Sequence, residues 1–171
     1  ITGNKKKFTY KELKEKVSKF AGALKNQGIK KGDRVIIYMP MIPEAVIGML
    51  ACARIGAIHS VVFGGFASNE LASRIDDSKA KVLLTASCGF EPGRTVQYKP
   101  LVDEALKLAS HKIEKLILFQ RPNNEVKLNT PKEISWEEAL SNAKNTDCVE
   151  MGSNEFAYIL YTSGTTGIPK G

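Results

Sequence analysis

The chain has 171 residues, 43% of them hydrophobic and 25% charged, which is enough apolar material for one globular core. No apolar run approaches the roughly 20 residues that a membrane-spanning helix needs. The net charge of +7 arises within residues 1–34, where ten lysines and one arginine face three acidic residues, a pattern typical of a solvated helix face rather than a nucleic-acid surface.

The first predicted element is an amphipathic helix that follows the basic N-terminal residues. Thr9 and Glu12 have the spacing of a capping box, and Gly28 is a typical residue after a helix end. The apolar residues between them recur at helical spacing and form one stripe. They are Leu13, Val17, Phe20, Ala21 and Leu24.

The remaining elements alternate between short apolar runs and amphipathic segments, with glycine or proline at most boundaries. The stretch 121–135 is polar and is expected to be irregular. The predicted elements are strand 34–39, helix 44–55, strand 57–63, helix 68–78 with Ser68 as its cap, strand 81–85, helix 100–109, strand 115–119, helix 136–143 and strand 156–160.

This alternation predicts an α/β fold. Strands that are continuous runs of valine, isoleucine and leucine are typical of a mostly parallel sheet covered by helices on both faces. No internal repeat or linker divides the sequence. We therefore expect residues 1–171 to form a single unit.

The last residues, 161–171, combine hydroxyl groups, glycines and one lysine directly after an apolar run that reads as a buried strand. Glycines let backbone N–H groups approach phosphate oxygens, hydroxyls add donors, and a lysine adds positive charge. The Walker A spacing is absent, and the alternative is a flexible Ser/Gly linker. Linkers rarely follow a strand so directly, so we predict phosphate binding by Thr162, Ser163, Gly164, Thr165, Thr166, Gly167 and Lys170.

This segment resembles the signature loop of the adenylate-forming superfamily, which includes acyl-CoA synthetases, firefly-type luciferases and peptide-synthetase adenylation domains. The resemblance implies that the loop wraps the β- and γ-phosphates of ATP. It also implies that the sheet is part of the large N-terminal, AMP-binding domain of such an enzyme. Members of the superfamily continue well beyond this loop, so we expect the chain to be an N-terminal fragment, a single partial domain.

Two inner segments, residues 37–66 and 88–94, resemble the short-chain acyl-CoA synthetases. Residues 37–57 are similar to their first βαβ unit, and residues 59–66 to their next strand and glycine turn. The resemblance implies that Gly64, Gly65 and Phe66 lie beside coenzyme A. Paired glycines at the carboxyl end of a strand also let a ligand approach the backbone. A tight turn without a ligand explains the two glycines equally well.

The second segment is the predicted loop 88–94. Acetyl-CoA synthetases have two arginines three residues apart here, which clamp the 3′-phosphate of CoA. Arg94 matches the second, whereas Glu91 stands at the first position, where a carboxylate would repel a phosphate. The sequence Glu91-Pro92-Gly93-Arg94 resembles that of the propionate-preferring branch, and the resemblance implies CoA contacts for these four residues. The role of Glu91 stays open, and a solvated loop arginine is the alternative for Arg94.

The cysteines give no sign of a disulfide or a metal centre. Cys52, Cys88 and Cys148 lie far apart and outside any CxxC spacing, and the chain has only two histidines. This pattern indicates reduced thiols in an intracellular protein and no metal ligand in this chain. We expect the protein to lie in the mitochondrial matrix or the cytoplasm.

The implied activity is that of an ATP-dependent short-chain acyl-CoA ligase. A short carboxylate, propionate or acetate, attacks the α-phosphorus of ATP and gives an acyl-adenylate and pyrophosphate, after which the CoA thiol attacks the acyl carbon. The implied cofactors are ATP, Mg²⁺ and coenzyme A, and no nucleic acid or membrane is expected as a partner. Lys170 would stabilise the leaving pyrophosphate.

The main catalytic lysine of the family lies in a C-terminal domain that this sequence does not contain, so the chain alone is expected to be inactive. Two other functions stay open. One is a non-catalytic α/β nucleotide-binding module, and the other is an adenylating enzyme that does not use CoA. The acid that is used and the oligomeric state are not determined by the sequence.

Overall fold

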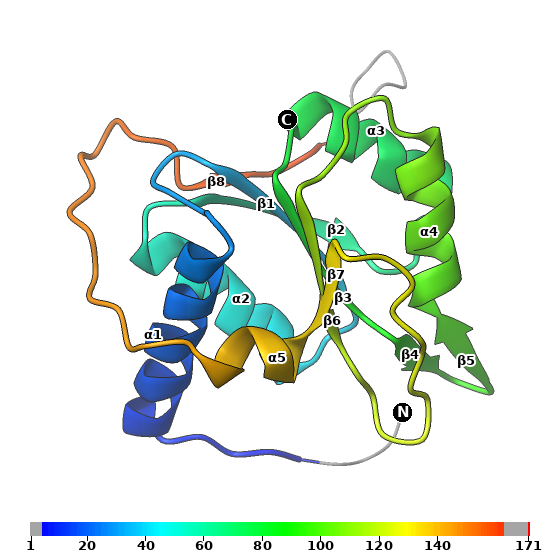
Figure 1. Ribbon diagram of the computed structural model, residues 1–171, viewed down its shortest axis with the longest axis horizontal. Helices are drawn as coiled ribbons and strands as arrows, with labels where there is room; N and C mark the ends of the chain where they lie inside the picture. The colour runs from blue at the N-terminus through cyan, green and yellow to red at the C-terminus, as the bar shows by residue number, and fades with distance from the viewer. Residues whose placement is uncertain (1–4, 163–170) are drawn as a thin grey trace.

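In a computed structural model of the chain, residues 5–162 and 171 are described. The elements follow one another around a central sheet (Figure 1). Within the described residues no helix combines the length and the apolar character needed to cross a membrane. The elements are α1 (Tyr10–Asn26), β1 (Arg34–Met39), α2 (Pro43–Arg54), β2 (Ile58–Phe63), α3 (Ser68–Ser78), β3 (Val82–Ala86), β4 (Cys88–Glu91), β5 (Arg94–Gln97), α4 (Tyr98–Leu108), β6 (Lys115–Phe119), β7 (Glu133–Ser135), α5 (Trp136–Ser141) and β8 (Tyr158–Ile159).

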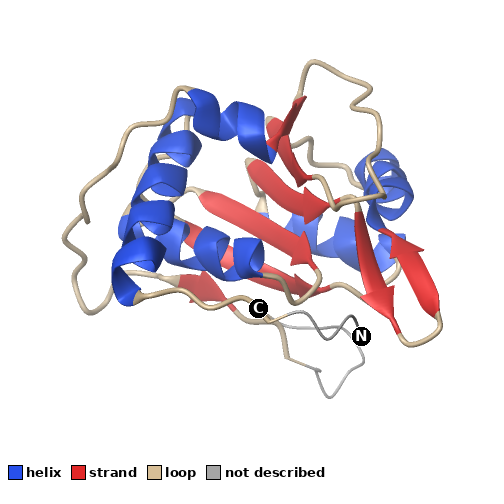
Figure 2. Cartoon of the chain, turned by 90° about the horizontal axis from the view of Figure 1, so that it is seen from below, coloured by secondary structure: helices blue, strands red, loops and turns tan. Residues whose placement is uncertain are grey.

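The main sheet has six strands in the order β7-β6-β3-β1-β2-β8, and all of its pairs are parallel. Helices cover both of its faces, as Figure 2 shows with the helices in blue on either side of the red strands. Residues of α1, α2 and α5 share one core with β1, β3 and β6, and residues of α3 and α4 share the other. The predicted fold class, a mostly parallel sheet flanked by helices, is confirmed.

The order of the strands places a switch point at β1. The chain leaves β1 through α2 to β2 on one side, and returns through α3 to β3 on the other side. Loops at the carboxyl ends of such neighbouring strands diverge and leave a crevice, which is where open parallel sheets bind ligands. The glycine turn follows β2, and β4 and β5 follow β3, so both predicted CoA segments lie at this edge.

The first helix forms where the capping box predicts it. The Thr9 side chain accepts a hydrogen bond from the Glu12 N–H at 3.2 Å, and the Glu12 carboxylate accepts from the Thr9 N–H at 2.7 Å. On the inner face of the helix the Phe20 ring stacks on Trp136 of α5, with 3.7 Å between centroids. These contacts fix α1 against α5 over one face of the sheet.

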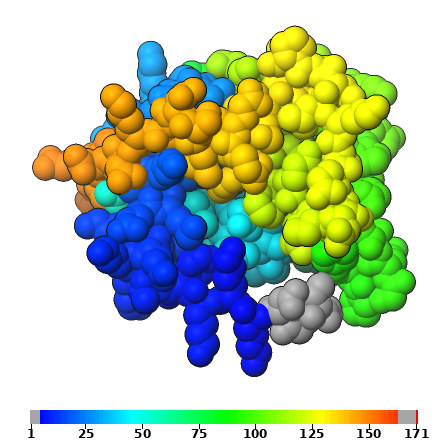
Figure 3. Space-filling view, turned by 60° about the horizontal axis from the view of Figure 1, so that its bottom comes forward, coloured from blue at the N-terminus to red at the C-terminus, as the bar shows by residue number. Residues whose placement is uncertain are grey.

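The segment after α5 runs back along α1 and α2. The N–H of Thr146 donates to the carbonyl of Ser18 at 3.2 Å, and the N–H of Val149 donates to the carbonyl of Arg54 at 2.9 Å. Figure 3 shows this orange segment beside the blue N-terminal helix. The close approach explains Gly22 in the middle of α1, because a Cβ there would overlap the backbone of Lys144.

Two predicted helix starts are wrong. Ser68 is the first residue of α3 rather than its cap, and its hydroxyl donates to Glu104 at 3.1 Å instead of accepting from the helix backbone. Helix α4 begins at Tyr98, two residues before Pro100. A proline in the first turn of a helix lacks only an N–H that has no partner within the helix, so Pro100 does not mark the start.

The predicted loop 88–94 is instead an antiparallel hairpin made of β4 and β5, in which Glu91 pairs with Arg94. Pro92 and Gly93 form its turn, and Gly93 has a φ of +76°. A proline-glycine turn with positive φ at the glycine provides the reversal that the hairpin needs.

A third short strand, β7, lies within the stretch that was predicted to be irregular, and it pairs with β6.

The predicted buried strand 156–160 is also wrong in length and burial. Only Tyr158–Ile159 form β8, and Phe156, Tyr158 and Leu160 are 78%, 61% and 66% exposed. These side chains are exposed because β8 lies at the edge of the sheet, where β2 is its one strand neighbour among the described residues. An apolar run indicates a buried strand only when another layer covers it.

Candidate functional site

The glycine turn after β2 is held by two tyrosines. The Tyr38 hydroxyl of β1 donates to the carbonyl of Phe66 at 2.7 Å, and burial raises the pKa of Tyr38 to about 12. The Tyr98 ring lies against Gly64, where a Cβ would overlap its hydroxyl. Packing therefore requires glycine at position 64, which favours the tight-turn interpretation for that residue. Gly65 is exposed and Phe66 half-buried, and CoA contact by the three residues stays a prediction.

Tyr98 also connects this turn to the hairpin. A Cβ at Gly89 of β4 would lie 2.9 Å from the Tyr98 ring, and the Tyr38 and Tyr98 rings meet edge to face at 5.1 Å. The structure thus brings the two segments that resemble CoA-binding elements into contact with the same tyrosine. Sequence reasoning missed Tyr98, since a single tyrosine before a helix carries no pattern of its own.

Glu91 and Arg94 form an ion pair across the hairpin turn. Two guanidinium nitrogens of Arg94 lie 2.6 and 2.7 Å from the Glu91 Oε2 atom, and the side chains of Arg94 and Glu91 are 71% and 38% exposed. Pro92 and Gly93 are exposed between them. The carboxylate that seemed out of place beside a phosphate is therefore a partner of Arg94. Contact of these four residues with CoA stays a prediction.

The segment that enters the predicted phosphate loop is fixed by α3. The Tyr161 hydroxyl donates to the Asp77 carboxylate at 2.5 Å, and burial, together with this bond, raises the pKa of Tyr161. Thr162 follows and is exposed. The other residues predicted to bind phosphate lie outside the described residues. These are Ser163, Gly164, Thr165, Thr166, Gly167 and Lys170.

Arg74 of α3 touches both predicted ligand segments. Its guanidinium carbon lies 4.7 Å from the centroid of the Phe66 ring and 5.1 Å from that of Tyr161. Arg74 is 6% exposed, which is unusual for a charged residue. Sequence reasoning did not identify it, because arginine on an amphipathic helix normally indicates the solvated face.

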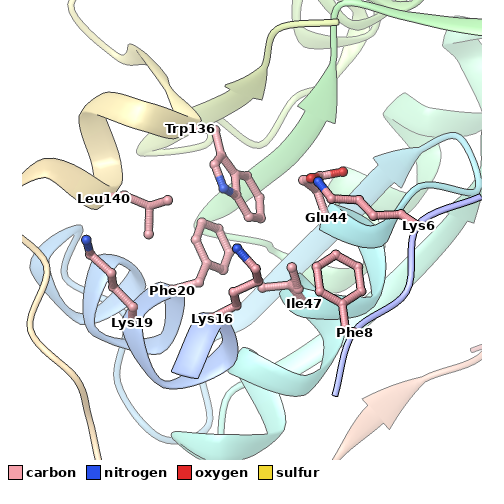
Figure 4. A pocket seen from close by; sticks show the side chains of 9 residues that line it. All are labelled: Lys6, Phe8, Lys16, Lys19, Phe20, Glu44, Ile47, Trp136 and Leu140. Carbon is pink, nitrogen blue, oxygen red and sulfur yellow. The ribbon is translucent and has the colours of Figure 1, made fainter. Parts of the chain in front are cut away.

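A separate pocket of about 220 Å³ lies between α1, α2 and α5. Figure 4 shows Trp136 and Phe20 at its base and the lysine side chains around it. None of the residues predicted to bind ATP or CoA lines this pocket. Its lining consists of Lys6, Phe8, Lys16, Lys19, Phe20, Glu44, Ile47, Trp136 and Leu140.

The described residues contain no group of three or more histidine, cysteine or acidic side chains placed to hold a metal ion. Cys52 and Cys88 are buried, and burial raises the pKa of both thiols. A raised thiol pKa disfavours the thiolate that metal binding and nucleophilic chemistry require.

Relatives of known description match the chain over nearly all of its length. It is 59% identical over 172 residues to acyl-CoA synthetase short-chain family member 3, mitochondrial, of Homo sapiens, covering 100% of this chain and 25% of that protein. It is 48% identical over 169 residues to acetyl-coenzyme A synthetase of Shewanella sediminis, covering 95% of this chain and 25% of that protein. The chain therefore spans about a quarter of the length of these relatives.

The fold and the family agree with these similarities. The structure of acetoacetyl-CoA synthetase from Streptomyces lividans superposes with a TM-score of 0.83 at 25% identity, over 94% of this chain and 24% of that one. The family model described as AMP-binding enzyme matches residues 1–171. The chain belongs to the family of AMP-binding enzymes.

Proposed function

We propose that residues 1–171 are part of the AMP-binding domain of an ATP-dependent short-chain acyl-CoA ligase. The observation that carries the proposal is the 59% identity, over the whole chain, to a short-chain acyl-CoA synthetase. In the proposed reaction a short carboxylate displaces pyrophosphate from ATP to form an acyl-adenylate. The CoA thiol then displaces AMP from the acyl carbon.

In this proposal the residues after Tyr161 bind the phosphates of ATP. Thr162, Ser163, Thr165 and Thr166 supply hydroxyl donors, and Gly164 and Gly167 leave backbone N–H groups open to the phosphate oxygens. Lys170 balances the charge that develops on the leaving pyrophosphate. Mg²⁺ would be bound together with ATP. It would neutralise part of the phosphate charge and so provide electrostatic stabilisation.

The hairpin and the glycine turn form the proposed CoA side of the site. Arg94 presents its guanidinium at the tip of the hairpin, where 71% of the side chain is exposed. An arginine in this setting can bind a phosphate through two parallel hydrogen bonds. Because Glu91 already occupies the guanidinium, a phosphate has to share or displace that carboxylate.

The proposed acid is propionate or acetate. The Glu91-Pro92-Gly93-Arg94 turn supports propionate, since it resembles that of the propionate-preferring branch. The proposed location is the mitochondrial matrix or the cytoplasm, and the printed name of the human relative describes that protein as mitochondrial. Neither nucleic acid nor membrane is part of the proposal.

The test is to measure the two half-reactions separately with the full-length protein. We expect propionate- or acetate-dependent exchange of pyrophosphate into ATP, and acyl-CoA formation when CoA is added. Exchange without thioester formation would indicate an adenylating enzyme that does not use CoA. Binding of ATP without either reaction would indicate a non-catalytic nucleotide-binding module and would overturn the proposal.

A further inference from the structure

Arg74 is a charged residue buried on the inner side of α3, and its charge has one ionic partner among the described residues. Its Nη1 atom lies 2.7 Å from the Glu70 carboxylate and donates to the Glu70 carbonyl at 2.8 Å. The side chain of Arg74 is 7% exposed and that of Glu70 is 49% exposed. Burying a guanidinium is unfavourable unless its contacts compensate for lost hydration. The other contacts of the guanidinium therefore have to contribute to this compensation.

Those contacts are two aromatic rings from distant parts of the chain. The guanidinium carbon is within 6 Å of both ring centroids, at 4.7 Å for Phe66 and 5.1 Å for Tyr161. A cation at this distance from an aromatic face is attracted to it, more strongly when water is excluded. Arg74 is thus a shared contact between the glycine turn and the segment that enters the phosphate loop.

Each of these two residues is also held by a second contact. The carbonyl of Phe66 accepts from Tyr38 at 2.7 Å, and the hydroxyl of Tyr161 donates to Asp77 at 2.5 Å. Asp77 lies one helical turn after Arg74 on the same helix. Helix α3 therefore holds Tyr161 both by its ring and by its hydroxyl, with the Phe66 ring on the same guanidinium.

We propose that Arg74 is a positioning residue that fixes the entrance of the ATP phosphate loop relative to the CoA-side glycine turn. The proposal rests on the proposed function for the roles of these two segments. Arg74 itself touches neither ligand in this account, and it acts through Phe66 and Tyr161. A planar guanidinium suits this role because it can lie against aromatic faces and still reach a carboxylate, which a lysine ammonium does less well.

A second arginine provides a matched control. Arg34 of β1 donates to the carbonyls of Ser78 and Lys79 at 2.8 and 3.0 Å, so it binds the end of the same helix. Among the described residues, the cation that lies over the Phe66 and Tyr161 rings is Arg74 and not Arg34. If Arg74 only anchors α3, loss of either arginine should have similar consequences. If Arg74 positions the two segments, only its loss should disturb them.

The experiment compares Arg74→Met, Arg74→Lys and Arg34→Met in the full-length protein. For Arg74→Met we expect the KM for ATP in pyrophosphate exchange to rise about tenfold, and the KM for CoA to rise severalfold, because the ring contacts are lost. Arg74→Lys should fall between the wild type and Arg74→Met. Arg34→Met should lower the melting temperature and leave both KM values unchanged. Equal KM changes in Arg34→Met and Arg74→Met would overturn the proposal.

Amide hydrogen exchange tests the same inference independently of catalysis. Arg74→Met should speed exchange in both 64–67 and 159–162, and Arg34→Met should speed it in neither. Unchanged exchange in these segments of Arg74→Met would overturn the positioning role. If the wild type catalyses no carboxylate-dependent exchange of pyrophosphate, the proposed function fails, and hydrogen exchange still decides whether Arg74 fixes the two segments.

Discussion

The charge at the tip of the hairpin is set by two side chains that bind each other. The Arg94 Nη2 atom lies 2.6 Å from the Glu91 Oε2 atom, and an ion pair as exposed as this one contributes little to stability. The ion pair instead affects the electrostatic attraction of an anion to this turn. The carboxylate offsets the positive charge that an incoming phosphate would meet, so the affinity of this turn for an anion depends on both residues.

This pair gives the first prediction. In the full-length protein Arg94→Ala should raise the KM for CoA about ten- to hundredfold, the size of one lost charge-assisted hydrogen bond, and should leave pyrophosphate exchange unchanged. Glu91→Gln should lower the KM for CoA slightly, because Arg94 then loses its competing partner. Both values come from steady-state thioester formation at varied CoA.

Dephospho-CoA provides the control for that prediction, since it lacks the 3′-phosphate. Arg94→Ala should leave the KM for dephospho-CoA at the wild-type value. If the substitution weakens both ligands equally, Arg94 does not bind that phosphate, and it is a solvated arginine paired with Glu91.

His59 of β2 is a second residue whose surroundings affect its charge. Its ring lies 5.8 Å from that of Tyr158, and its Nδ1 atom is buried without a hydrogen-bond partner among the described residues. Burial lowers the pKa of His59 from its ordinary value of 6.5. The folded protein thus binds a proton on His59 less readily than the unfolded chain does.

The second prediction follows from that difference. Between the lowered pKa and pH 6.5 the unfolded state holds more protons than the folded state, so the free energy of unfolding rises with pH. On acidification it should fall with a slope of at most about 1.4 kcal/mol per pH unit from this group. Denaturant unfolding from pH 7.5 to 5.0 measures the slope, and His59→Gln should make it shallower. Parallel curves for the two proteins would show that His59 is not responsible.

At the scale of an element, the glycine turn after β2 contains two glycines with different requirements. A Cβ at Gly64 would overlap the Tyr98 hydroxyl, which is held in the core. A Cβ at Gly65 would lie 2.6 Å from the outer edge of the Phe63 ring, and Phe63 is 70% exposed. The first neighbour cannot move without disturbing the core, whereas the second can turn into solvent.

The third prediction is therefore a contrast between neighbouring residues. Gly64→Ala should lower the free energy of unfolding by about 1–3 kcal/mol, as other overpacking substitutions do, and Gly65→Ala by less than about 1 kcal/mol. Adding Tyr98→Phe should recover part of the loss in Gly64→Ala, since it removes the overlapping hydroxyl. An equal loss in the two single variants would show that Tyr98 does not determine the glycine at position 64.

The elements differ in how well the sequence predicted them, and local signals explain the difference. Helix α1 has a capping box, and β1 and β6 each consist of one basic residue followed by an apolar run, with the predicted bounds 34–39 and 115–119. The hairpin and β7 were missed because their residues are mostly polar or small. Their pairing depends on partners that the sequence pattern does not reveal, namely each other for β4 and β5 and the edge of β6 for β7.

The candidate site was predicted only where residues carry a pattern. The glycine pair and the Glu91–Arg94 turn were identified by resemblance, and their contacts with CoA remain predictions. Tyr98 and Arg74 were missed because each acts through tertiary contacts, Tyr98 against Gly64 and Gly89, and Arg74 against Phe66 and Tyr161. A buried arginine on a helix is indistinguishable in sequence from one that faces solvent.

At the scale of the whole molecule, the sheet is covered unevenly. Val61 and Phe63 of β2 are 45% and 70% exposed, whereas Val62 between them is buried in the core with α3 and α4. Because side chains alternate along a strand, Val61 and Phe63 lie on the face of the sheet opposite to that of Val62. In the register that pairs His59 with Tyr158, the next residues place Leu160 beside Val61. Among the described residues this apolar edge is exposed, and the chain spans 25% of the length of its human relative.

The fourth prediction is that the rest of a full-length protein covers this edge. Leu160→Ser should then lower the free energy of unfolding of the full-length protein by about 2–4 kcal/mol, as substitutions of buried leucines do. Leu108→Ser on α4 is the matched control, because Leu108 is 52% exposed and Leu160 is 66% exposed in the chain, yet Leu108 lies on a helix away from β8. It should change stability by less than about 0.5 kcal/mol. If both leucines can be replaced at equally low cost, the edge at β8 stays exposed in the whole protein, and its apolar residues need another partner.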